Sequence, residues 1–302
     1  MKIIVTGSLG HISKPLTEKL IARGHEVTVI SSNAEKASSI INMGATAAIG
    51  SVEDLDFIKE VFSTADAVYT MVPPVSYMEP NLDPIRHFTK IGNIYADAIA
   101  ESNIRRVVNL SSWGAHRDNG TGGIVGTYHL EQIFNRLAVN FHVSHIRPTS
   151  FYYNLLGLIP VIKHTGKISA NYGAEDVTVL VSPEDIAEAV AEEIEVLDSI
   201  NIKKVRYVAS DELSCNEVAH ILGKSIGMPD LVWELITPEQ AQQNLERAGL
   251  PKHSATLLVE LQQGHHSGII AEDYRIHRPQ LGKVKLTQYA EEFAVAFRNY
   301  NT

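Results

Sequence analysis

The sequence predicts an α/β protein built on a doubly wound parallel sheet. Along its first half, short apolar runs rich in β-branched residues alternate with segments whose apolar residues recur at helical spacing. Such alternation is typical of parallel strands joined by right-handed crossover helices. A second observation is a glycine-containing turn at residues 7–13, which links the first apolar run to the first amphipathic segment. Doubly wound sheets that bind nucleotides begin in this way.

Strands and helices alternate regularly in the first half. The strands are expected at residues 2–6, 27–30, 45–49, 67–72, 106–110 and 143–146. The helices between them are expected at residues 13–23, 34–43, 54–62, 84–101 and 127–137. The last helix has the clearest pattern, because Leu130, Ile133, Phe134 and Leu137 share one helix face at the i, i+3, i+4, i+7 spacing.

The second half is less regular. Strands are expected at residues 176–181 and 205–209, and helices at residues 183–197, 216–226, 238–248, 256–263 and 287–299. Ser182 is placed to cap the first of these helices, and Pro183 suits its first position. No linker rich in proline, glycine or serine divides the chain. We therefore expect residues 1–150 to form the sheet domain, with residues 151–302 as a smaller α/β lobe packed against it and partly contributing to it.

Composition excludes several classes of protein. The 302-residue chain has a net charge of −9, which argues against a nucleic-acid surface. A single cysteine excludes an intrachain disulfide framework, and no histidine pair has further ligands in a metal-binding pattern, so no metal site is expected. The sequence has neither a signal-peptide pattern nor an apolar run of about 18 residues. We expect a cytoplasmic protein without a membrane span.

The turn after the first strand predicts dinucleotide binding. Gly7 and Gly10 stand at the first two positions of a glycine motif, and Ser13 takes the place of its third glycine. Glycines let the backbone approach a pyrophosphate, which binds at the N-terminus of the following helix. The alternative is an ordinary glycine-containing loop, but the position between strand and helix favours nucleotide binding. Residues 1–150 are therefore predicted to bind NAD(P).

The end of the second strand favours NADP over NAD. A carboxylate at this point would accept hydrogen bonds from the adenosine ribose and repel a 2′-phosphate, and none is present. The hydroxyls of Ser31 and Ser32, the amide of Asn33 and Lys36 could hold such a phosphate instead. The segment contains no arginine, the better phosphate ligand, and Lys36 could equally be a solvated helix residue. NADP is thus preferred, with NAD as the alternative.

Several short motifs, in order along the chain, resemble those of the NmrA-like atypical short-chain dehydrogenases. They are the turn at residues 7–13, Gly50 after the third strand, residues 72–74 after the fourth, Ser111-Ser112 after the fifth, residues 147–154 after the sixth and the segment 182–187. That family includes NAD(P)H:quinone oxidoreductases and redox-sensing regulators. The resemblance implies a Rossmann-like domain with a small C-terminal lobe over its open edge.

The resemblance also implies positions for the cofactor, each at the carboxyl end of a strand. The residues implied near the pyrophosphate are Gly7, Leu9, Gly10, His11 and Ile12, with Ser31, Ser32 and Lys36 near the adenosine ribose. Ser51 and Val52 would lie near the adenine, Val72 and Pro73 near the inner ribose, and Ser111 and Phe151 beside the nicotinamide.

The catalytic pair of the wider dehydrogenase class is missing. That class reduces carbonyls with a Tyr-x-x-x-Lys pair, whose tyrosine transfers a proton. Here Tyr128 is followed four positions later by Gln132, and no lysine occurs between Lys90 and Lys163. Carbonyl chemistry by that pair is therefore not expected.

Two functional interpretations remain open. In the first, the protein reduces a small quinone-like acceptor that needs little acid catalysis, with Tyr128 or His129 moving a proton or orienting the substrate. In the second, it senses NAD(P) without turnover and acts through a regulatory protein partner; other chemistry, such as isomerisation, is a further alternative. A homodimer is compatible with either.

Aromatic residues and a glycine-rich stretch complete the candidates. Trp113 could stack on an aromatic acceptor, or it could be a core residue at a strand end. One of Tyr152 and Tyr153 is expected to line the substrate pocket, and we assign Tyr152. His129 could equally be a surface histidine. Residues 120–126, with four glycines, are expected to form a mobile flap over the site.

Overall fold

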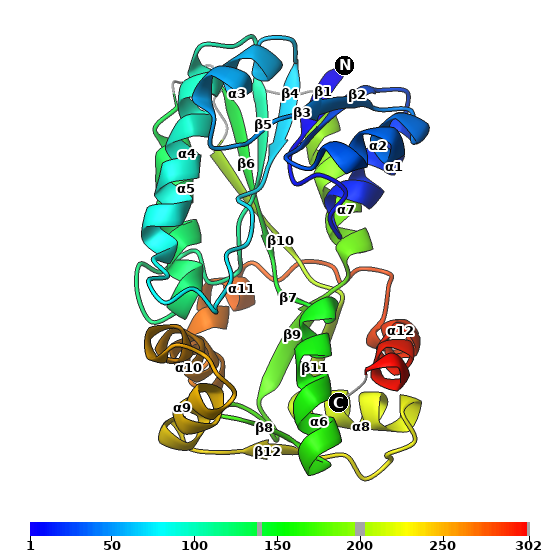
Figure 1. Cartoon of the computed structure of the whole chain (residues 1–302), viewed down its shortest axis with the longest axis vertical. Helices are drawn as coiled ribbons and strands as arrows, with labels where there is room; N and C mark the ends of the chain where they lie inside the picture. The colour runs from blue at the N-terminus through cyan, green and yellow to red at the C-terminus, as the bar shows by residue number, and fades with distance from the viewer. Residues whose placement is uncertain (138–140, 197–202, 301–302) are drawn as a thin grey trace.

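A computed structural model describes residues 1–137, 141–196 and 203–300. The upper part of the molecule is a seven-stranded sheet in the order β10-β6-β5-β4-β1-β2-β3 (Figure 1). All of its neighbouring strands pair in parallel. The doubly wound parallel sheet predicted from the sequence is confirmed.

The sheet strands follow the predicted apolar runs closely. They are β1 (Lys2–Val5), β2 (Glu26–Ser31), β3 (Thr46–Ile49), β4 (Ala67–Thr70), β5 (Arg106–Leu110), β6 (His142–Pro148) and β10 (Lys203–Val208). The central strands β1 and β4 are almost wholly apolar and buried, because helices cover both faces of the sheet. Strand β6 is buried as well but carries polar side chains, among them Arg147. Strand β10 comes from the second half of the chain and forms one edge of the sheet beside β6.

One core lies on each face of the sheet. On one face, α3 (Leu55–Phe62), α4 (Pro84–Ala100) and α5 (Val125–Asn135) pack over the strands. On the other, α1 (Ser13–Ala22), α2 (Ala37–Asn42) and α7 (Pro183–Glu195) do so (Figure 1). The predicted helix at residues 34–43 begins as a short 3-10 turn, η1 (Ala34–Lys36), before α2. The predicted end of α7 at residue 197 lies outside the described residues.

The lower part of the molecule is a small lobe with its own core. Strands β7 (Ser150–Phe151), β9 (Val177–Val181) and β11 (Asp211–Ser214) form one sheet, and β8 (Ile168–Ala170) pairs with β12 (Trp233–Leu235). The helices around them are η3 (Tyr152–Leu158), α6 (Ile159–Thr165), α8 (Cys215–Ser225), α9 (Pro238–Arg247), α10 (Lys252–His266), η4 (Ile269–Ala271), α11 (Glu272–Ile276) and α12 (Leu286–Asn299). The three-residue strands β8 and β12, and the short helices α6 and α11, were not predicted.

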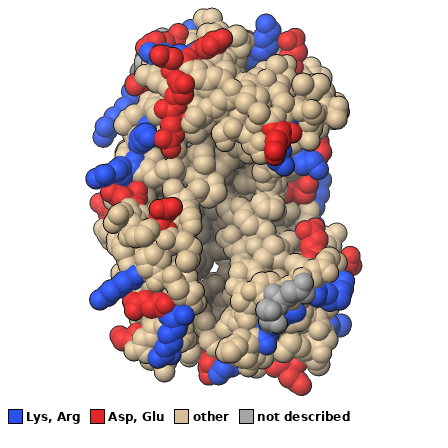
Figure 2. Space-filling model, in the orientation of Figure 1, with Lys and Arg blue, Asp and Glu red and all other residues tan. Residues whose placement is uncertain are grey.

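A hollow runs down one face of the molecule. It begins below the β1–α1 turn and continues between α10 and α6 in the lower lobe, and most of the Lys, Arg, Asp and Glu side chains in this view lie away from it, toward the outline of the molecule (Figure 2). Ligands of open α/β sheets bind at the carboxyl ends of the strands, where this hollow begins. None of the described helices is both long and apolar enough to span a bilayer.

Candidate functional site

The turn after β1 has the backbone that its glycine motif predicts. Gly7 and Ser8 adopt positive φ angles of 87° and 55°. A Cβ atom on Gly7 would lie 2.2 Å from the Sδ atom of Met71, so only glycine fits there. The Ser13 hydroxyl donates to the Thr6 carbonyl at 2.8 Å. Serine therefore ties the start of α1 to the end of β1, where the motif usually has its third glycine.

The N-terminus of α1 is open to an anion. The backbone N–H groups of Leu9, His11 and Ile12 have no hydrogen-bond partner among the described residues. No side chain caps this helix, and its first turn has no acidic residue. Unpaired N–H groups at a helix N-terminus are the donors that a pyrophosphate requires. The turn therefore fits the pyrophosphate of a dinucleotide.

The serines at the end of β2 have different surroundings. The Ser31 side chain is buried and holds the turn in place, since its hydroxyl oxygen accepts a 2.9 Å hydrogen bond from Ser8 and another from the Asn33 N–H group. Ser32 and Lys36 are exposed, and neither side chain has a polar partner in the described part of the chain. Of Ser31, Ser32 and Lys36, the last two therefore have side chains free for a 2′-phosphate.

Four further predicted cofactor residues follow β3 and β4. Ser51 is exposed, and its hydroxyl accepts a hydrogen bond from the N–H group of Glu53. Val52 is half-buried, Val72 is buried, and the Pro73 carbonyl contacts Nε2 of His87 at 2.8 Å. All four lie beyond the carboxyl ends of their strands, as predicted, but no contact in the structure tests their roles.

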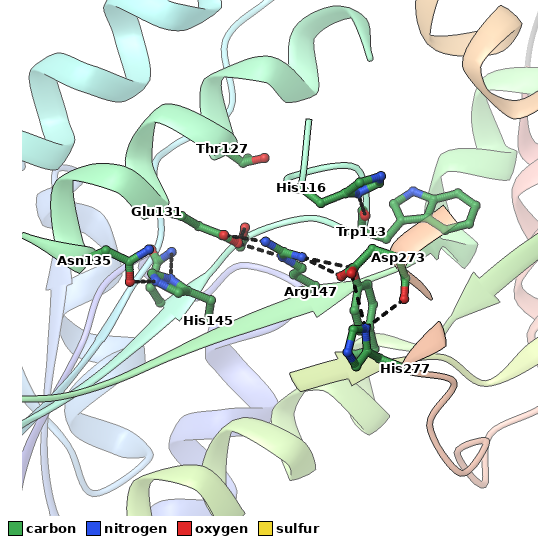
Figure 3. Close-up of polar contacts among 12 residues, drawn as sticks. Trp113, His116, Thr127, Glu131, Asn135, His145, Arg147, Asp273 and His277 are labelled. Atoms are coloured by element: carbon green, nitrogen blue, oxygen red, sulfur yellow. Dashed lines mark hydrogen bonds and ion pairs between the residues drawn. The ribbon is translucent and has the colours of Figure 1, made fainter. Parts of the chain in front are cut away.

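Ser111, at the end of β5, contacts α5 through a carboxylate that was not predicted. Its buried hydroxyl donates to Oε1 of Glu131 at 2.5 Å. Thr127 and Glu131 are buried one helical turn apart on α5 (Figure 3). The predicted catalytic residues Tyr128 and His129 are half-buried, and their rings contact each other at 5.3 Å. The structure does not bring either of them into hydrogen-bond contact with Ser111.

Glu131 belongs to a buried ionic network. Arg147, from β6, donates to Oε1 from Nε at 2.9 Å and to Oε2 from Nη2 at 2.6 Å, a two-point pairing. Its Nη1 donates to Asp273 of α11 and to the Tyr207 hydroxyl (Figure 3). Burial would lower the pKa of Arg147, but the hydrogen bonds and charge of Glu131 raise it overall. The network thus joins the sheet domain to the lower lobe.

The two tyrosines after β7, Tyr152 and Tyr153, differ in burial, and the more buried one is the residue assigned to the substrate pocket. Tyr152, assigned to the substrate pocket, is fully buried, and its hydroxyl donates to Asp211 at 2.6 Å. A ring without exposed surface cannot contact a substrate, so this assignment does not agree with the structure. Tyr153 is half-buried and stacks on Phe151 at 5.0 Å and on His11 at 4.3 Å.

Trp113 is likewise part of a core. Its ring is 2% exposed and packs against His265 at 5.0 Å and Tyr274 at 6.2 Å. Of the two interpretations of Trp113, the structure favours a core residue over a stacking surface. Its neighbour His265, on α10, is half-buried and also stacks on Tyr172. Burial lowers the pKa of His265 to about 4, so its ring is neutral near pH 7.

The glycine-rich stretch is packed rather than free. The Gly120 N–H group donates to Glu260 of α10 at 2.9 Å. A Cβ atom on Gly122, whose φ is 54°, would lie 2.1 Å from the Leu257 carbonyl oxygen. Residues 120–126 are therefore held against α10, and the predicted mobile flap does not agree with this contact. Among the described residues, no group of three or more His, Cys, Asp or Glu side chains is placed to hold a metal ion.

Sequence reasoning missed Glu131, Arg147 and Asp273. Glu131 stands on the apolar helix face defined by Leu130 and Phe134, and an acid at such a position predicts a buried cation nearby. That signal was present in the sequence. The partner Asp273 lies 126 residues beyond Arg147, and no local pattern connects the two.

Comparison with curated proteins gives short matches. The chain is 37% identical over 68 residues to an uncharacterised protein of Schizosaccharomyces pombe, a match covering 22% of this chain and 23% of that protein. It is 24% identical over 123 residues to sterol demethylase protein B of Methylococcus capsulatus, covering 40% of this chain and 38% of that one. The matches therefore span less than half the length of either relative.

Solved structures share the fold over nearly the whole chain. A triphenylmethane reductase of Citrobacter sp. has a TM-score of 0.77 and 17% identity, with 97% of this chain and 100% of that chain covered. An NADPH-dependent quinone oxidoreductase of Escherichia coli, solved with NADPH, has a TM-score of 0.75 and 15% identity, covering 96% and 99%. A nucleoside-diphosphate-sugar epimerase of Staphylococcus aureus has a TM-score of 0.76 and 15% identity, covering 96% and 100%.

At these identities the structural likeness establishes the fold alone. The family follows from the sequence match, because the model of the NmrA-like family matches residues 1–267. This match covers most of the chain and includes the turn after β1, Ser111, Glu131 and Arg147. The chain belongs to the NmrA-like family.

Proposed function

We propose that the protein is an NADP(H)-dependent oxidoreductase that reduces a small, neutral, quinone-like acceptor. A bound reduced nicotinamide would supply the hydride, and one proton taken up from water or a side chain would convert the resulting hydroquinone anion into the hydroquinone. The solved relatives named above include two reductases, one of which is described as a quinone oxidoreductase. The proposal for this chain rests on its own residues.

The cofactor would be held by backbone groups of the turn after β1. The unpaired N–H groups of Leu9, His11 and Ile12 would bind the pyrophosphate. Ser32 and Lys36 would bind a 2′-phosphate, which supports the preference for NADP. The buried hydroxyl of Ser31 would keep this turn in the binding conformation through its hydrogen bond from Ser8.

The observation that carries the proposal is the chemistry of the α5 face next to Ser111. The buried positions one turn apart there are Thr127 and Glu131, and no lysine occurs from residue 91 to residue 162. An acceptor that needs strong acid catalysis would have no Tyr-Lys pair to supply it. A quinone accepts hydride readily, so catalysis would consist mainly of positioning it over the nicotinamide.

The character of the hollow supports a neutral acceptor. In the view of Figure 2 its walls are formed largely by residues other than Lys, Arg, Asp and Glu. A nucleoside-diphosphate sugar, the substrate class named for the epimerase relative, carries a pyrophosphate that binding sites usually pair with Arg or Lys. An uncharged aromatic acceptor needs no such partner, and Tyr153 and Phe151 offer half-buried rings.

The roles of Tyr128 and His129 stay predictions. Either could pass a proton toward the reduced acceptor, and neither side chain is tied to a polar partner in the described part of the chain. The alternative function is an NAD(P) sensor that acts through a protein partner, as some members of the family do. A homodimer stays a possibility under both functions.

One assay separates the two functions. Purified protein is mixed with NADPH or NADH and a panel of quinones, and oxidation of the nucleotide is followed by absorbance. The enzyme should show saturation kinetics with a preference for NADPH. Tight NADPH binding without turnover on any quinone would favour the sensor instead. Failure to bind either nucleotide would remove both functions.

A further inference from the structure

The Ser111 side chain, at the ligand-binding end of β5, already donates its proton to a buried carboxylate. Its hydroxyl donates to Glu131 Oε1 at 2.5 Å, and both side chains are buried. Charge-assisted hydrogen bonds of this length are among the strong ones in proteins. The direction of the Ser111 hydroxyl is therefore fixed by the protein before any ligand binds.

The direction of this hydrogen bond follows from Arg147. The guanidinium pairs with both carboxylate oxygens of Glu131, at 2.9 Å and 2.6 Å, which keeps that carboxylate in its charged form. A charged carboxylate has no proton to give, so Ser111 must be the donor. The structure contains no proton on Ser111 that is free for a substrate oxygen.

The Ser111 oxygen still has lone pairs to offer. No donor group among the described residues approaches this oxygen, and its own proton is occupied by Glu131. Ser111 follows the last residue of β5, at the carboxyl edge of the sheet where ligands bind. Toward a ligand, Ser111 can therefore act only as a hydrogen-bond acceptor.

We propose that Glu131 fixes Ser111 as the acceptor for the carboxamide N–H of the nicotinamide. Glu131 is then a positioning residue, held by Arg147, and Ser111 is a cofactor-recognition residue rather than a proton donor to the substrate. The proposal rests on the proposed function, since it requires that NADPH binds. It also explains why this site can dispense with acid catalysis: the hydroxyl that could polarise a substrate carbonyl is turned toward the protein.

The test compares NADPH with its reduced 3-acetylpyridine analogue, in which a methyl ketone replaces the carboxamide. The analogue keeps the carbonyl oxygen and loses the N–H donors. Direct binding is measured by calorimetry, without an acceptor. Wild-type protein should bind NADPH about tenfold more tightly than the analogue, the effect of one hydrogen bond. Ser111→Ala should bind both about equally, and the control Ser112→Ala should keep the wild-type preference.

A second variant tests the role of Glu131. Replacing the ion pair by Glu131→Met with Arg147→Met removes the carboxylate together with its buried cation. Asp273 loses its contact with Arg147 but keeps those with Tyr207 and His277. The Ser111 hydroxyl can then rotate and donate to the carbonyl of either nucleotide, so the preference should fall to about twofold. Thermal unfolding confirms that each variant is folded before binding is measured.

The outcomes are distinct. Equal wild-type affinity for the two nucleotides, or a preference that persists in Ser111→Ala, would overturn the recognition role of Ser111 while leaving NADPH binding intact. A preference lost in Ser111→Ala but kept in the double variant would overturn the positioning role of Glu131. A wild-type protein that binds neither nucleotide contradicts the proposed function itself.

Discussion

The imidazole of His11 lies nearly parallel to the ring of Tyr153, with centroids 4.3 Å apart and planes at 19°. His11 belongs to the turn after β1, and Tyr153 to η3 at the start of the lower lobe. The contact therefore joins the two parts of the molecule at the carboxyl end of the sheet. The Tyr153 ring also stacks on the Phe151 ring, with centroids 5.0 Å apart.

The first prediction concerns the Tyr153 ring. Tyr153→Ala removes a flat surface beside the cofactor turn and should raise the KM for a quinone about tenfold, the usual worth of an aromatic contact. Tyr153→Phe should keep the wild-type KM, because the Tyr153 hydroxyl has no hydrogen-bond partner among the described residues. Steady-state kinetics at saturating NADPH checks both.

The adjacent tyrosine provides the control. Tyr152→Phe removes hydrogen bonds to Asp211 and to the Val284 carbonyl, and should lower the free energy of unfolding by about 1–2 kcal/mol without changing the KM. If Tyr152→Phe raised the KM and Tyr153→Ala did not, the division of roles between the two tyrosines would be wrong.

Much of this fold could be predicted from the sequence, because its signals are local. Strands that are buried on both faces appear in the sequence as apolar runs, and the buried face of α5 is predicted by the spacing of Leu130 and Phe134. Strands β8 and β12 could not be predicted, since three residues give no periodicity and Ile168 meets Trp233 only in the folded lobe. They are specified by tertiary packing.

The candidate site was predicted only in part for the same reason. The turn at Gly7 is local, so its conformation follows from its residues. The partner of Ser111 is set by how α5 packs on β5 and β6, and a search for a Tyr-x-x-x-Lys pair directs attention to Tyr128 instead of Glu131. The choice between Tyr152 and Tyr153 depended on which ring the lower lobe buries.

The second prediction separates folding from cofactor binding in the β1–α1 turn. Gly10 is exposed and has no positive φ, and a Cβ atom there would lie 3.1 Å from the Gly7 carbonyl oxygen, so Gly10→Arg should lower the melting temperature only slightly while its side chain blocks the pyrophosphate position and abolishes NADPH binding. Gly7→Ala should destabilise the fold by about 2 kcal/mol or more, since it combines a positive φ with a steric clash. Calorimetric titration and thermal unfolding together check the pair. Full NADPH affinity in Gly10→Arg would show that the cofactor binds elsewhere.

The third prediction concerns the ion pair between Glu131 and Arg147. Arg147→Met leaves Glu131 buried without its cation and should lower the free energy of unfolding by about 3–5 kcal/mol. The double variant with Glu131→Met should regain most of that loss, because Glu131 no longer stays buried as an unpaired charge and the more exposed Asp273 keeps its contact with His277. Chemical denaturation of both variants measures the difference. Equal stability of the single and double variants would mean that the pair is not desolvated.

The fourth prediction is acid lability from His265. Burial lowers the pKa of His265 to about 4, against an unfolded value of 6.5, while the charge of Asp176 opposes this shift. Protonation therefore favours the unfolded state. Stability is complete above about pH 6.5 and is lost as the pH falls toward 4, by up to about 2 kcal/mol at pH 5.

A histidine variant isolates this contribution from the carboxylates that titrate at lower pH. Between pH 7 and pH 5, the melting temperature of His265→Gln should fall by less than that of the wild type. His220→Gln, which removes an exposed histidine, should behave like the wild type over the same interval. An identical acid response in His265→Gln and wild type would show that the His265 ring titrates as if in solvent.

The fifth prediction tests whether residues 120–126 are anchored. Gly122→Ala places a methyl group 2.1 Å from the Leu257 carbonyl oxygen at a φ of 54°, so α10 must shift, and the free energy of unfolding should fall by about 2–3 kcal/mol. Hydrogen exchange should rise in α10, where the Leu257 carbonyl lies. The control Gly157→Ala adds a methyl group with no neighbour within 4 Å at an ordinary φ, and should be neutral or stabilise by up to about 1 kcal/mol. A Gly122→Ala variant as stable as wild type would mean that this segment moves independently of α10, as expected for a mobile flap.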